Sequence, residues 1–493
     1  MRSMLRWLLI AMTITFTLLI LADIALPRGP AIIYQHLPKL NPVASLDQNL
    51  SSGTTSTLHD FWRAWSRIIH ETRPQAAAIT LLGTAATEFL PPRAENVRTP
   101  YADLVRNQVA DIDALHDAHA RYVKELASHN VYPDTFRGRG VVVVGGGEYF
   151  GPAIIGIHML RRSGSELPVE VFVPNEKEYN PTLCERYLVK LNAKCLILDH
   201  VLKNGAHGIE TSEVSHYQYK ALAILFSSFE EVLLLDSDSI PLVDPAKELF
   251  ATEQYNSTGL VIWPDFWVST ESPRFWSVAG LPGMPSNLPR TSSETGQLLI
   301  NKRTHLRTLL LATYYNIYGP KYYYPLLSQG ALGQGDKETF MAAAAVLNAP
   351  FHRVQAPVEA LGRNNGREEK GTAMVQYLLG PGSALTTPSE ASPAPEVRPA
   401  FLHCNTPKMN AAHLIDEGDL LSVDGKTRLR LLGEQREQID HFGFDLERAL
   451  WELLVQTGCE LADTIREWKT RDRLCERLEE HYAAVFSESD SNP

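Results

Sequence analysis

Cysteine is scarce in this sequence of 493 residues, and the five that occur are Cys184, Cys195, Cys404, Cys459 and Cys475. So small a number does not support a fold built on disulfides, and the lack of any C-x-x-C pair argues against a structural zinc site. In an oxidising compartment the neighbours Cys184/Cys195 and Cys459/Cys475 could form disulfides and leave Cys404 single. Alternatively all five are small buried hydrophobic residues, and the sequence leaves both possibilities open.

Excess positive charge and internal repeats are also lacking. Lysine and arginine total 46 against 57 aspartate and glutamate residues, so the formal charge is −11, which makes nucleic acid an unsuitable partner. The 31 glycines and 31 prolines are spread along the chain without a repeating unit, which excludes solenoids and propellers. Hydrophobic residues make up 44% and charged residues 21%, as in ordinary globular proteins.

A long apolar run stands near the N-terminus. Residues 7–26 contain one charge, Asp23, and follow Arg2 and Arg6. A helix of this length reaches about 30 Å, enough to span a bilayer, and the preceding arginines place residues 1–6 in the cytoplasm. We therefore expect a single-pass type II signal anchor with the rest of the chain in the lumen. A cleaved signal peptide is the alternative, although its cleavage motif is poor here.

The rest of the chain divides by composition into four regions. Residues 27–57 are rich in Pro, Ser, Thr and Asn, as in a stem, and residues 58–135 show helical periodicity. Residues 136–410 alternate strand and helix patterns, which predicts an α/β, Rossmann-like sheet. Residues 411–493 have amphipathic spacing and predict a C-terminal helical extension. The expected strands are 141–144, 169–173, 194–198 and 232–235, and the expected helices are 58–70, 110–128, 153–162, 184–191, 216–226 and 305–315.

The clearest candidate site follows the apolar run Val232–Leu235, which is typical of a buried central strand. Asp236-Ser237-Asp238 comes directly after it. Ligands of open α/β sheets bind at the carboxyl ends of strands, and paired carboxylates suit a hard divalent ion such as Mn²⁺ or Mg²⁺ against a diphosphate. We predict a metal site here in preference to the alternative, a simple turn at the strand end.

Other candidate residues are assigned a role only because of this predicted metal site. His403 is a candidate third metal ligand, and Lys408 is a candidate phosphate-binding residue. Glu294, which precedes an expected hydrophobic helix, is either a helix-start carboxylate or an acceptor-binding group. Asp336 is either an N-cap or a carboxylate directed at a sugar hydroxyl. Gly145-Gly146-Gly147 could form a tight turn or let the backbone approach a nucleotide.

Blocks of sequence between residues 136 and 410 carry a resemblance to a known family. They include Leu234-Leu235-Asp236-Ser237-Asp238, Trp263-Pro264-Asp265, Glu294-Thr295-Gly296-Gln297, Gly335-Asp336-Lys337-Glu338-Thr339-Phe340 and His403. In order and spacing these blocks resemble the fungal Golgi mannosyltransferase family, glycosyltransferase family 71, which includes the α-1,2-mannosyltransferases of cell-wall mannan branching.

The resemblance implies a GT-A-type glycosyltransferase domain and a lumenal, metal-dependent enzyme of the Golgi membrane. It implies transfer of mannose from GDP-mannose to a mannose of mannan or of an N-glycan outer chain, with retention of configuration. Other Golgi mannosyltransferases are candidate partners. Asp236 and Asp238 would hold Mn²⁺ together with His403, and Lys220 or Lys408 would stabilise the leaving diphosphate.

The catalytic group that enforces retention has several candidates, because general-base and positioning roles depend on distance rather than on residue type. These candidates are Asp265, Glu294, Gln297 and Asp336. Three tryptophans could offer stacking faces for sugars, although core packing is the safer interpretation for at least one of them. They are Trp263, Trp267 and Trp276.

Three other functions compete with this hypothesis. The same fold could use UDP-GlcNAc or UDP-galactose, since a paired-carboxylate motif recognises diphosphate and metal rather than base or sugar. A non-catalytic mannan-binding subunit of a Golgi complex is a second alternative, which the intact Asp236, Asp238 and His403 argue against. A glycoside hydrolase with a carboxylate pair would need no metal, so strict metal dependence would exclude it.

Overall fold

The computed structural model describes residues 57–89, 101–129, 132–205, 214–380, 398–416 and 418–486. All of these belong to one compact unit, Leu50–Pro493. Within the described ranges, no helix is long and apolar enough to cross a membrane. The anchor expected at residues 7–26, and the stem as far as residue 56, lie outside the described residues.

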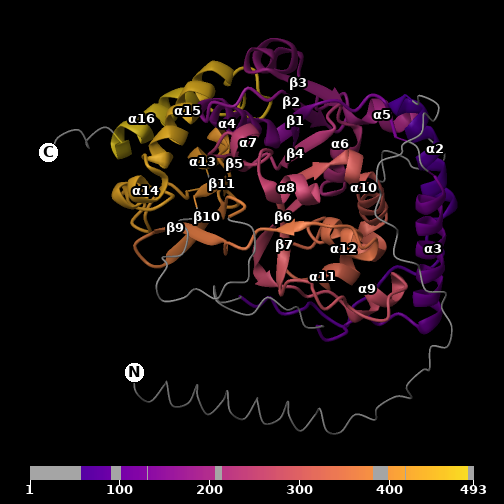
Figure 1. Cartoon of the computed structure of the whole chain (residues 1–493). Helices are drawn as coiled ribbons and strands as arrows, with labels where there is room; N and C mark the ends of the chain where they lie inside the picture. Colours follow the sequence, from indigo (N-terminus) through magenta and orange to yellow (C-terminus); the bar gives the residue numbers. More distant parts are fainter. Residues whose placement is uncertain are drawn as a thin grey trace, which may run out of the picture. The chain divides into compact units, whose positions relative to one another are not determined.

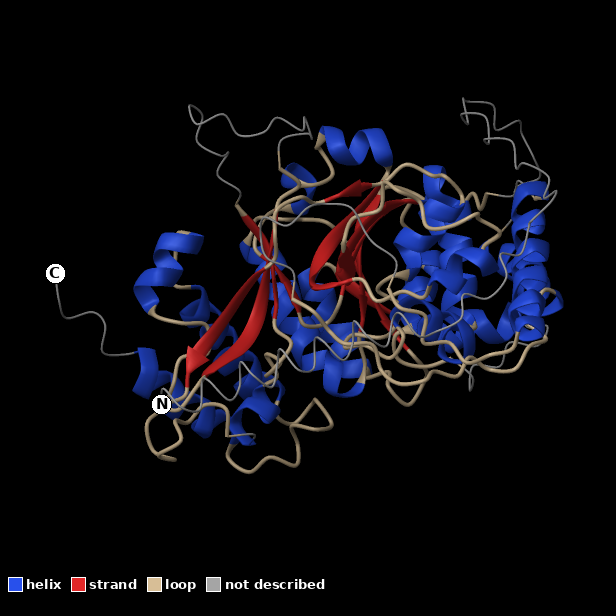
Figure 2. Cartoon of the chain, turned by 90° about the horizontal axis from the view of Figure 1, so that it is seen from below, coloured by secondary structure: helices blue, strands red, loops and turns tan. Residues whose placement is uncertain are grey.

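A mixed seven-stranded sheet forms the centre, with helices on both sides of the strands (Figures 1 and 2). Its order is β3-β2-β1-β4-β7-β6-β8. The strands are β1 Arg139–Val144, β2 Val169–Val173, β3 Ala193–Ile197, β4 Glu231–Leu235, β6 Leu260–Val268, β7 Thr291–Asn301 and β8 His352–Arg353. The strands β3, β2, β1 and β4 run parallel, whereas β7 is antiparallel to both β4 and β6. Because the chain passes from β1 to β2 on one side and later adds β4 on the other, the topological switch point lies between β1 and β4.

Alternate residues of the central strands belong to two hydrophobic cores. Val142 and Leu234 contribute to one core, while Val143 and Leu235 contribute to the other. Strands buried on both faces need apolar side chains at successive positions, which explains their uninterrupted hydrophobic sequences.

Two groups of helices complete these cores. The first core includes residues of α2 Leu58–Glu71, α3 Val109–Ser128, α5 Leu198–Gly205, α6 Gln218–Phe226, α9 Pro273–Val278, α10 Lys302–Ile317, α11 Tyr324–Ser328 and α12 Thr339–Val346. The second includes residues of α4 Phe150–Arg162, α8 Glu253–Thr258, α13 Ala411–Asp416, α15 Leu446–Leu461 and α16 Leu474–Phe486. The short α7 Pro245–Glu248 and the helix α14 Gln435–Phe442 lie between these elements in sequence.

A second, antiparallel sheet has the order β5-β11-β10-β9. Its strands are β5 Ser239–Pro241, β9 Glu359–Asn364, β10 Glu369–Tyr377 and β11 Pro399–His403. Strand β5 begins one residue after Asp238, and its pairing with β11 sets Ser239 opposite His403. This pairing therefore brings position 403 beside position 238, although 165 residues of sequence separate the two.

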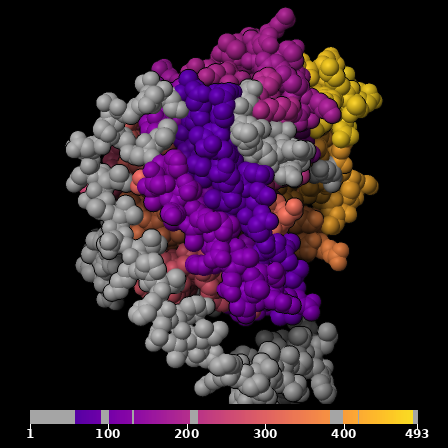
Figure 3. Space-filling model, turned by 90° about the vertical axis from the view of Figure 1, so that its right-hand side faces the viewer, coloured from indigo at the N-terminus to yellow at the C-terminus, as the bar shows by residue number. Residues whose placement is uncertain are grey.

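The N-terminal helices α2 and α3 lie across one face of the molecule, where Figure 3 shows them as an indigo-to-purple strip. The Thr57 side chain caps α2 by accepting a hydrogen bond from the Asp60 N–H. Phe61, Trp62 and Trp65 of α2 are buried. The Tyr122 hydroxyl of α3 donates a 2.8 Å hydrogen bond to the Leu310 carbonyl, which ties α3 to α10.

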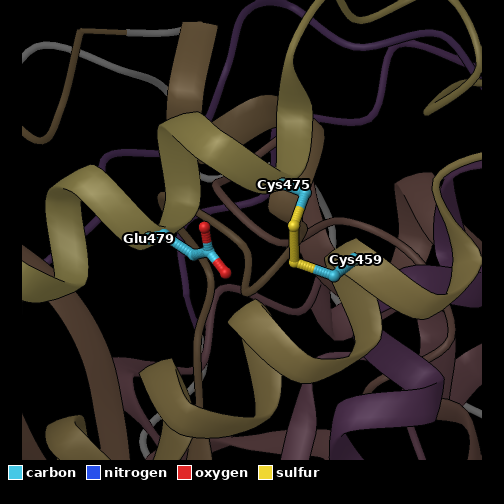
Figure 4. Close-up of side chains that lie close together, drawn as sticks. All are labelled: Cys459, Cys475 and Glu479. Atoms are coloured by element: carbon cyan, nitrogen blue, oxygen red, sulfur yellow. A yellow bond between two sulfur atoms is a disulfide. The ribbon is translucent and has the colours of Figure 1, made fainter.

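Of the two possibilities left open for the cysteines, the structure shows disulfides between neighbours. Cys184 bonds to Cys195, and Cys459 bonds to Cys475 and so links α15 to α16 (Figure 4). Cys404 is buried and free. Glu479 lies near the second disulfide (Figure 4). This group offers no soft metal site, because its sulfurs are bonded to each other and provide no thiolate.

Most expected elements are present, with ends that differ by a few residues. The expected helix 184–191 is instead a π-helical turn, η2 Thr182–Tyr187, followed by a 3₁₀ turn, η3 Leu188–Leu191. The helix expected after Gln297 is wrong, because these residues lie in strand β7. A short apolar run such as Leu298–Ile300 does not distinguish a buried strand from a buried helix.

We predict that breaking the disulfide between residues 184 and 195 destabilises the fold. The double change Cys184→Ser/Cys195→Ser removes a cross-link across 11 residues of sequence. The free energy of unfolding in urea should fall by about 2–3 kcal/mol, because the unfolded chain becomes less constrained.

Thiol titration of the denatured, unreduced protein is the control for this prediction. It should find a single free thiol, that of Cys404. A titre of all five cysteines would contradict the assigned pairing.

Candidate active site

The Asp236-Ser237-Asp238 segment connects the two sheets at the switch point. The Asp236 N–H donates to the Gly296 carbonyl of β7 at 2.8 Å, and the Ser239 N–H donates to the Asp236 carbonyl at 3.0 Å. These two hydrogen bonds fix the backbone that carries Asp236 and Asp238 at the carboxyl end of β4. Adjacent β1 ends at Val144, next to this segment.

Asp238 lies between two cationic side chains. Its Oδ1 is 3.2 Å from His403 Nε2, and its Oδ2 contacts the Lys408 ammonium. The Cys404 N–H donates to the Asp238 carbonyl at 2.9 Å. Burial opposes ionisation of Asp238, but His403 and Lys408 outweigh burial and lower the pKa of this carboxyl. Asp238 is therefore an ionised carboxylate with only 5% of its side chain exposed.

Asp236 and Asp336 share the ammonium of Lys220, which α6 supplies. The Lys220 Nζ is 2.8 Å from Asp236 Oδ2 and 3.3 Å from Asp336 Oδ1. Burial opposes the charge on Lys220, yet the two carboxylates outweigh burial and raise the pKa of the lysine. Burial raises the pKa of both aspartates, against the effect of Lys220.

The second oxygen of Asp336 is buried, and no described residue forms a hydrogen bond with it. The alternative role of Asp336 as a helix N-cap is not what the structure shows. Helix α12 begins at Thr339, and its N-cap position is Glu338. Asp336 therefore retains an unpartnered oxygen within the charged cluster.

Glu294 lies behind His403. Its Oε1 is 3.2 Å from His403 Nδ1 and accepts a 2.6 Å hydrogen bond from the Gly296 N–H, while its Oε2 accepts from Gln297 Nε2 at 2.5 Å. Gln297 in turn accepts a hydrogen bond from the Ser239 hydroxyl at 3.2 Å. Asp238 and Glu294 raise the pKa of His403 although burial acts against its charge. Glu294 therefore lies where carboxylates lie behind metal-binding histidines, although His403 Nδ1 has no hydrogen-bond partner among the described residues.

Gly296 makes this arrangement possible. A Cβ at this position would lie 2.5 Å from His403 Nδ1 and 2.8 Å from Glu294 Oε1. Sequence reasoning did not single out Gly296 or Ser239. The only available signal was the glycine within the Glu294–Gln297 block.

Asp265 stands apart from these contacts. Its Oδ2 pairs with Lys337 Nζ at 2.9 Å, and its Oδ1 accepts from the Phe266 N–H at 2.7 Å. Asp265 lies in β6 two residues after Trp263, and Trp263 pairs with Glu294 of β7. Asp265 therefore lies near the site with its carboxylate already engaged.

Two of the three candidate stacking tryptophans are core residues. Trp263 is fully buried and Trp276 is 1% exposed, so core packing, the safer interpretation, is confirmed for these two and neither offers a stacking face. Trp267 is partly buried, and its ring lies 6.1 Å from that of Phe266. Of the three, Trp267 retains some exposed surface.

The residues present fit a divalent cation. Asp236, Asp238 and His403 each offer a ligand atom, and these three atoms lie within 4.8 Å of one another. The cluster contains four carboxyl groups against two lysines, and His403 must release its proton before it can bind a metal. Two carboxylates and an imidazole match the ligands of Mn²⁺, while carboxylates also suit Mg²⁺.

These features define an open α/β protein with a cluster of candidate cation ligands at its switch point, where ligands bind in such folds. Comparison with known sequences identifies the family of the chain. The Mannosyl_trans3 family model, described as a mannosyltransferase, matches residues 138–288 and 283–378.

Several relatives carry the name α-1,2-mannosyltransferase. MNN21 of Candida albicans is 33% identical over 448 residues, covering 78% of this chain and 66% of the relative. MNN24 of the same organism is 32% identical over 480 residues, covering 78% and 67%. MNN2 of Saccharomyces cerevisiae is 36% identical over 300 residues, covering 54% and 50%.

The chain therefore belongs to the α-1,2-mannosyltransferase family of yeasts, which confirms the family resemblance and the prediction of a glycosyltransferase. It spans about two thirds of the length of the two Candida relatives.

Solved structures show weaker similarity. The glycosyltransferase GlyE of Streptococcus pneumoniae superposes with a TM-score of 0.29 and 14% identity, over 44% of this chain and 45% of that one. The galactosyltransferase LgtC, solved with donor and acceptor sugar analogues, gives 0.26 and 14%, over 42% and 70%. We draw no conclusion from matches at these TM-scores.

We predict that Gly296→Ala weakens metal binding. The added Cβ would displace His403 or Glu294, so the affinity for Mn²⁺ should fall about 10-fold or more, and the free energy of unfolding should fall by about 1–3 kcal/mol. Titration calorimetry with Mn²⁺ measures the first effect and urea denaturation the second.

Gly283→Ala is the matched control, because a Cβ there meets no atom within 4 Å. An unchanged Mn²⁺ affinity in Gly296→Ala would show that the close approach of His403 and Glu294 is not needed for the site.

Proposed function

We propose that the protein is a metal-dependent α-1,2-mannosyltransferase of GT-A type that transfers mannose from GDP-mannose to mannan or N-glycan mannose with retention of configuration. The observation that carries this proposal is the Asp236, Asp238 and His403 cluster at the switch point of a member of this family. These three side chains would hold Mn²⁺, which when bound offsets the charge that grows on the departing diphosphate.

The exposure and contacts of Lys220 and Lys408 support a different role for each lysine. The Lys408 ammonium contacts Asp238 and the side chain is 36% exposed, so the ammonium is accessible to a diphosphate. Lys220 is 11% exposed and holds both Asp236 and Asp336. We assign Lys408 to the leaving group and Lys220 to the positioning of the two aspartates.

Retention can follow from transfer on one face of the sugar. The bond from mannose C1 to the diphosphate oxygen breaks, the bond from C1 to the acceptor oxygen forms on the same face, and the acceptor proton passes to the departing phosphate. Of the four candidate polar residues, Asp336 has an unpartnered buried oxygen, so we favour it for contact with the sugar. Glu294 and Gln297 bond to each other behind His403 and are better suited to positioning.

A lumenal location in the Golgi forms part of the proposal, with residues 7–26 as the type II anchor. The two disulfides support an oxidising compartment. Asn256 of the sequon Asn256-Ser257-Thr258 is exposed on α8, as a glycan acceptor requires. Other Golgi mannosyltransferases remain candidate partners.

We predict that the full chain adds one mannose to α-1,6-mannobiose from GDP-mannose in the presence of Mn²⁺, measured as a mass increase. Chelation with EDTA should abolish the product. Asp238→Asn and Asp236→Asn should each lower the rate by about 100-fold or more, because each removes charge that the cation site requires.

Asp113→Asn, an exposed carboxylate change on α3, is the control and should leave the rate unchanged. Transfer that persists in EDTA would contradict the metal-dependent mechanism. Transfer from UDP-GlcNAc or UDP-galactose in preference to GDP-mannose would favour the alternative donors. Folded protein that binds neither Mn²⁺ nor nucleotide would favour a non-catalytic subunit.

A further inference from the structure

A cavity of about 250 Å³ lies at the carboxyl ends of β1 and β2. Three segments line it: the loop after β1, the loop after β2, and the turn between α15 and α16. Its lining includes Gly147, Phe150, Glu178, Tyr179 and Arg466. Sites for whole small molecules usually measure about 300–1,000 Å³, so this cavity has room for one part of a ligand, such as a ring system.

Hydrogen bonds connect the wall of this cavity to the metal-binding cluster. Lys408 contacts Asp238. Two residues further on, Asn410 donates to the Glu148 carbonyl at 2.9 Å and accepts from Trp468 Nε1 at 3.1 Å. Glu148 follows the cavity residue Gly147. These contacts place the wall of the cavity close to the cluster, on the side of the loop after β1.

Glu178 supplies an unused acceptor in the cavity wall. Its Oε2 is buried, and no described residue gives it a hydrogen bond. Arg466 Nη2 lies 3.7 Å from this oxygen, beyond hydrogen-bond distance. Gly147 has φ of +52°, and a Cβ there would lie 3.1 Å from this oxygen. A side chain at position 147 would therefore crowd this oxygen, and the Glu467 carboxylate, whose Oε1 would lie 3.8 Å from the same Cβ, is a second acceptor beside it.

We propose that this cavity receives the guanine ring of the donor nucleotide and that the Glu178 carboxylate binds the ring's N1–H and 2-amino groups. This inference rests on the proposed function. Guanine presents these two donors side by side, which a carboxylate can accept with its two oxygens. Uracil and adenine lack this pair of donors. Phe150 and Tyr179 add aromatic surface to the cavity, of the kind on which nucleobases pack.

The assignment makes Glu178 a specificity-determining residue for the donor. A site built to hydrogen-bond a donor group rejects an analogue that lacks that group, because its own polar atom is then left unpaired. Inosine diphosphate (IDP) differs from GDP only by the missing 2-amino group. It therefore isolates one of the two hydrogen bonds that Glu178 would make.

The test measures dissociation constants of GDP, IDP and UDP for the full chain in saturating Mn²⁺. The wild type should bind GDP on the order of 10-fold more tightly than IDP, as expected for a hydrogen bond to a charged group. In Glu178→Gln this preference should fall to about twofold or less, because the amide has one acceptor oxygen in place of two. Glu176→Gln, an exposed change on the same loop that pairs with His200, should keep the wild-type preference.

Mn²⁺ binding without nucleotide reports whether each variant is folded, and Glu178→Asp provides a second variant that keeps the carboxylate and shortens its reach. If Glu178→Gln fails to fold, a GDP-over-IDP preference in Glu178→Asp equal to that of the wild type overturns the inference.

Two outcomes separate this inference from the proposed function. Mannose transfer from GDP-mannose by a wild type that binds GDP and IDP equally would overturn the inference and leave the function standing. Tighter binding of UDP than of GDP by the wild type would overturn the proposed donor and the inference with it.

Discussion

The site depends on the balance of charge around Asp236 and Asp238, which the fold places close together with little access to water. A buried carboxylate is costly unless opposite charge faces it. Lys220 supplies that charge to Asp236, while His403 and Lys408 supply it to Asp238. These contacts come from α6, from β11 and from the segment after β11, so the charge balance joins parts of the chain that are far apart in sequence.

The two sheets meet where these charges gather. Strand β4 ends at Leu235, and β5 starts at Ser239, so the intervening three residues are held at both ends. The pairing of β5 with β11 brings His403 to Asp238, and the pairing of β4 with β7 brings Gly296 to Asp236. Metal binding, as proposed, would use side chains that the backbone already positions. Such preorganisation lowers the cost of gathering charge during a reaction.

The sequence predicted the parallel part of the sheet well, because β1 and β4 contain continuous apolar runs and Glu170 is the one polar residue within β2. It also predicted which residues gather at the site, since Asp236, Asp238, His403, Lys220, Asp336 and Glu294 all lie in one network of contacts. Their chemical roles stay predictions.

Strand β7 was not predicted. Its apolar segment is too short for its periodicity to separate a strand from a helix, and the sheet, rather than local preference, decides the outcome. The part played by Gly296 also depends on a tertiary contact with His403, which no local pattern contains.

The most direct measurement of the central claim is a crystal structure of the protein grown with MnCl₂ and GDP, with anomalous diffraction recorded for manganese. The account predicts one strong anomalous peak within ligand distance of Asp236, Asp238 and His403, with the diphosphate between that peak and Lys408. Bound GDP without an anomalous peak at these three residues, or a peak at another position, would contradict it.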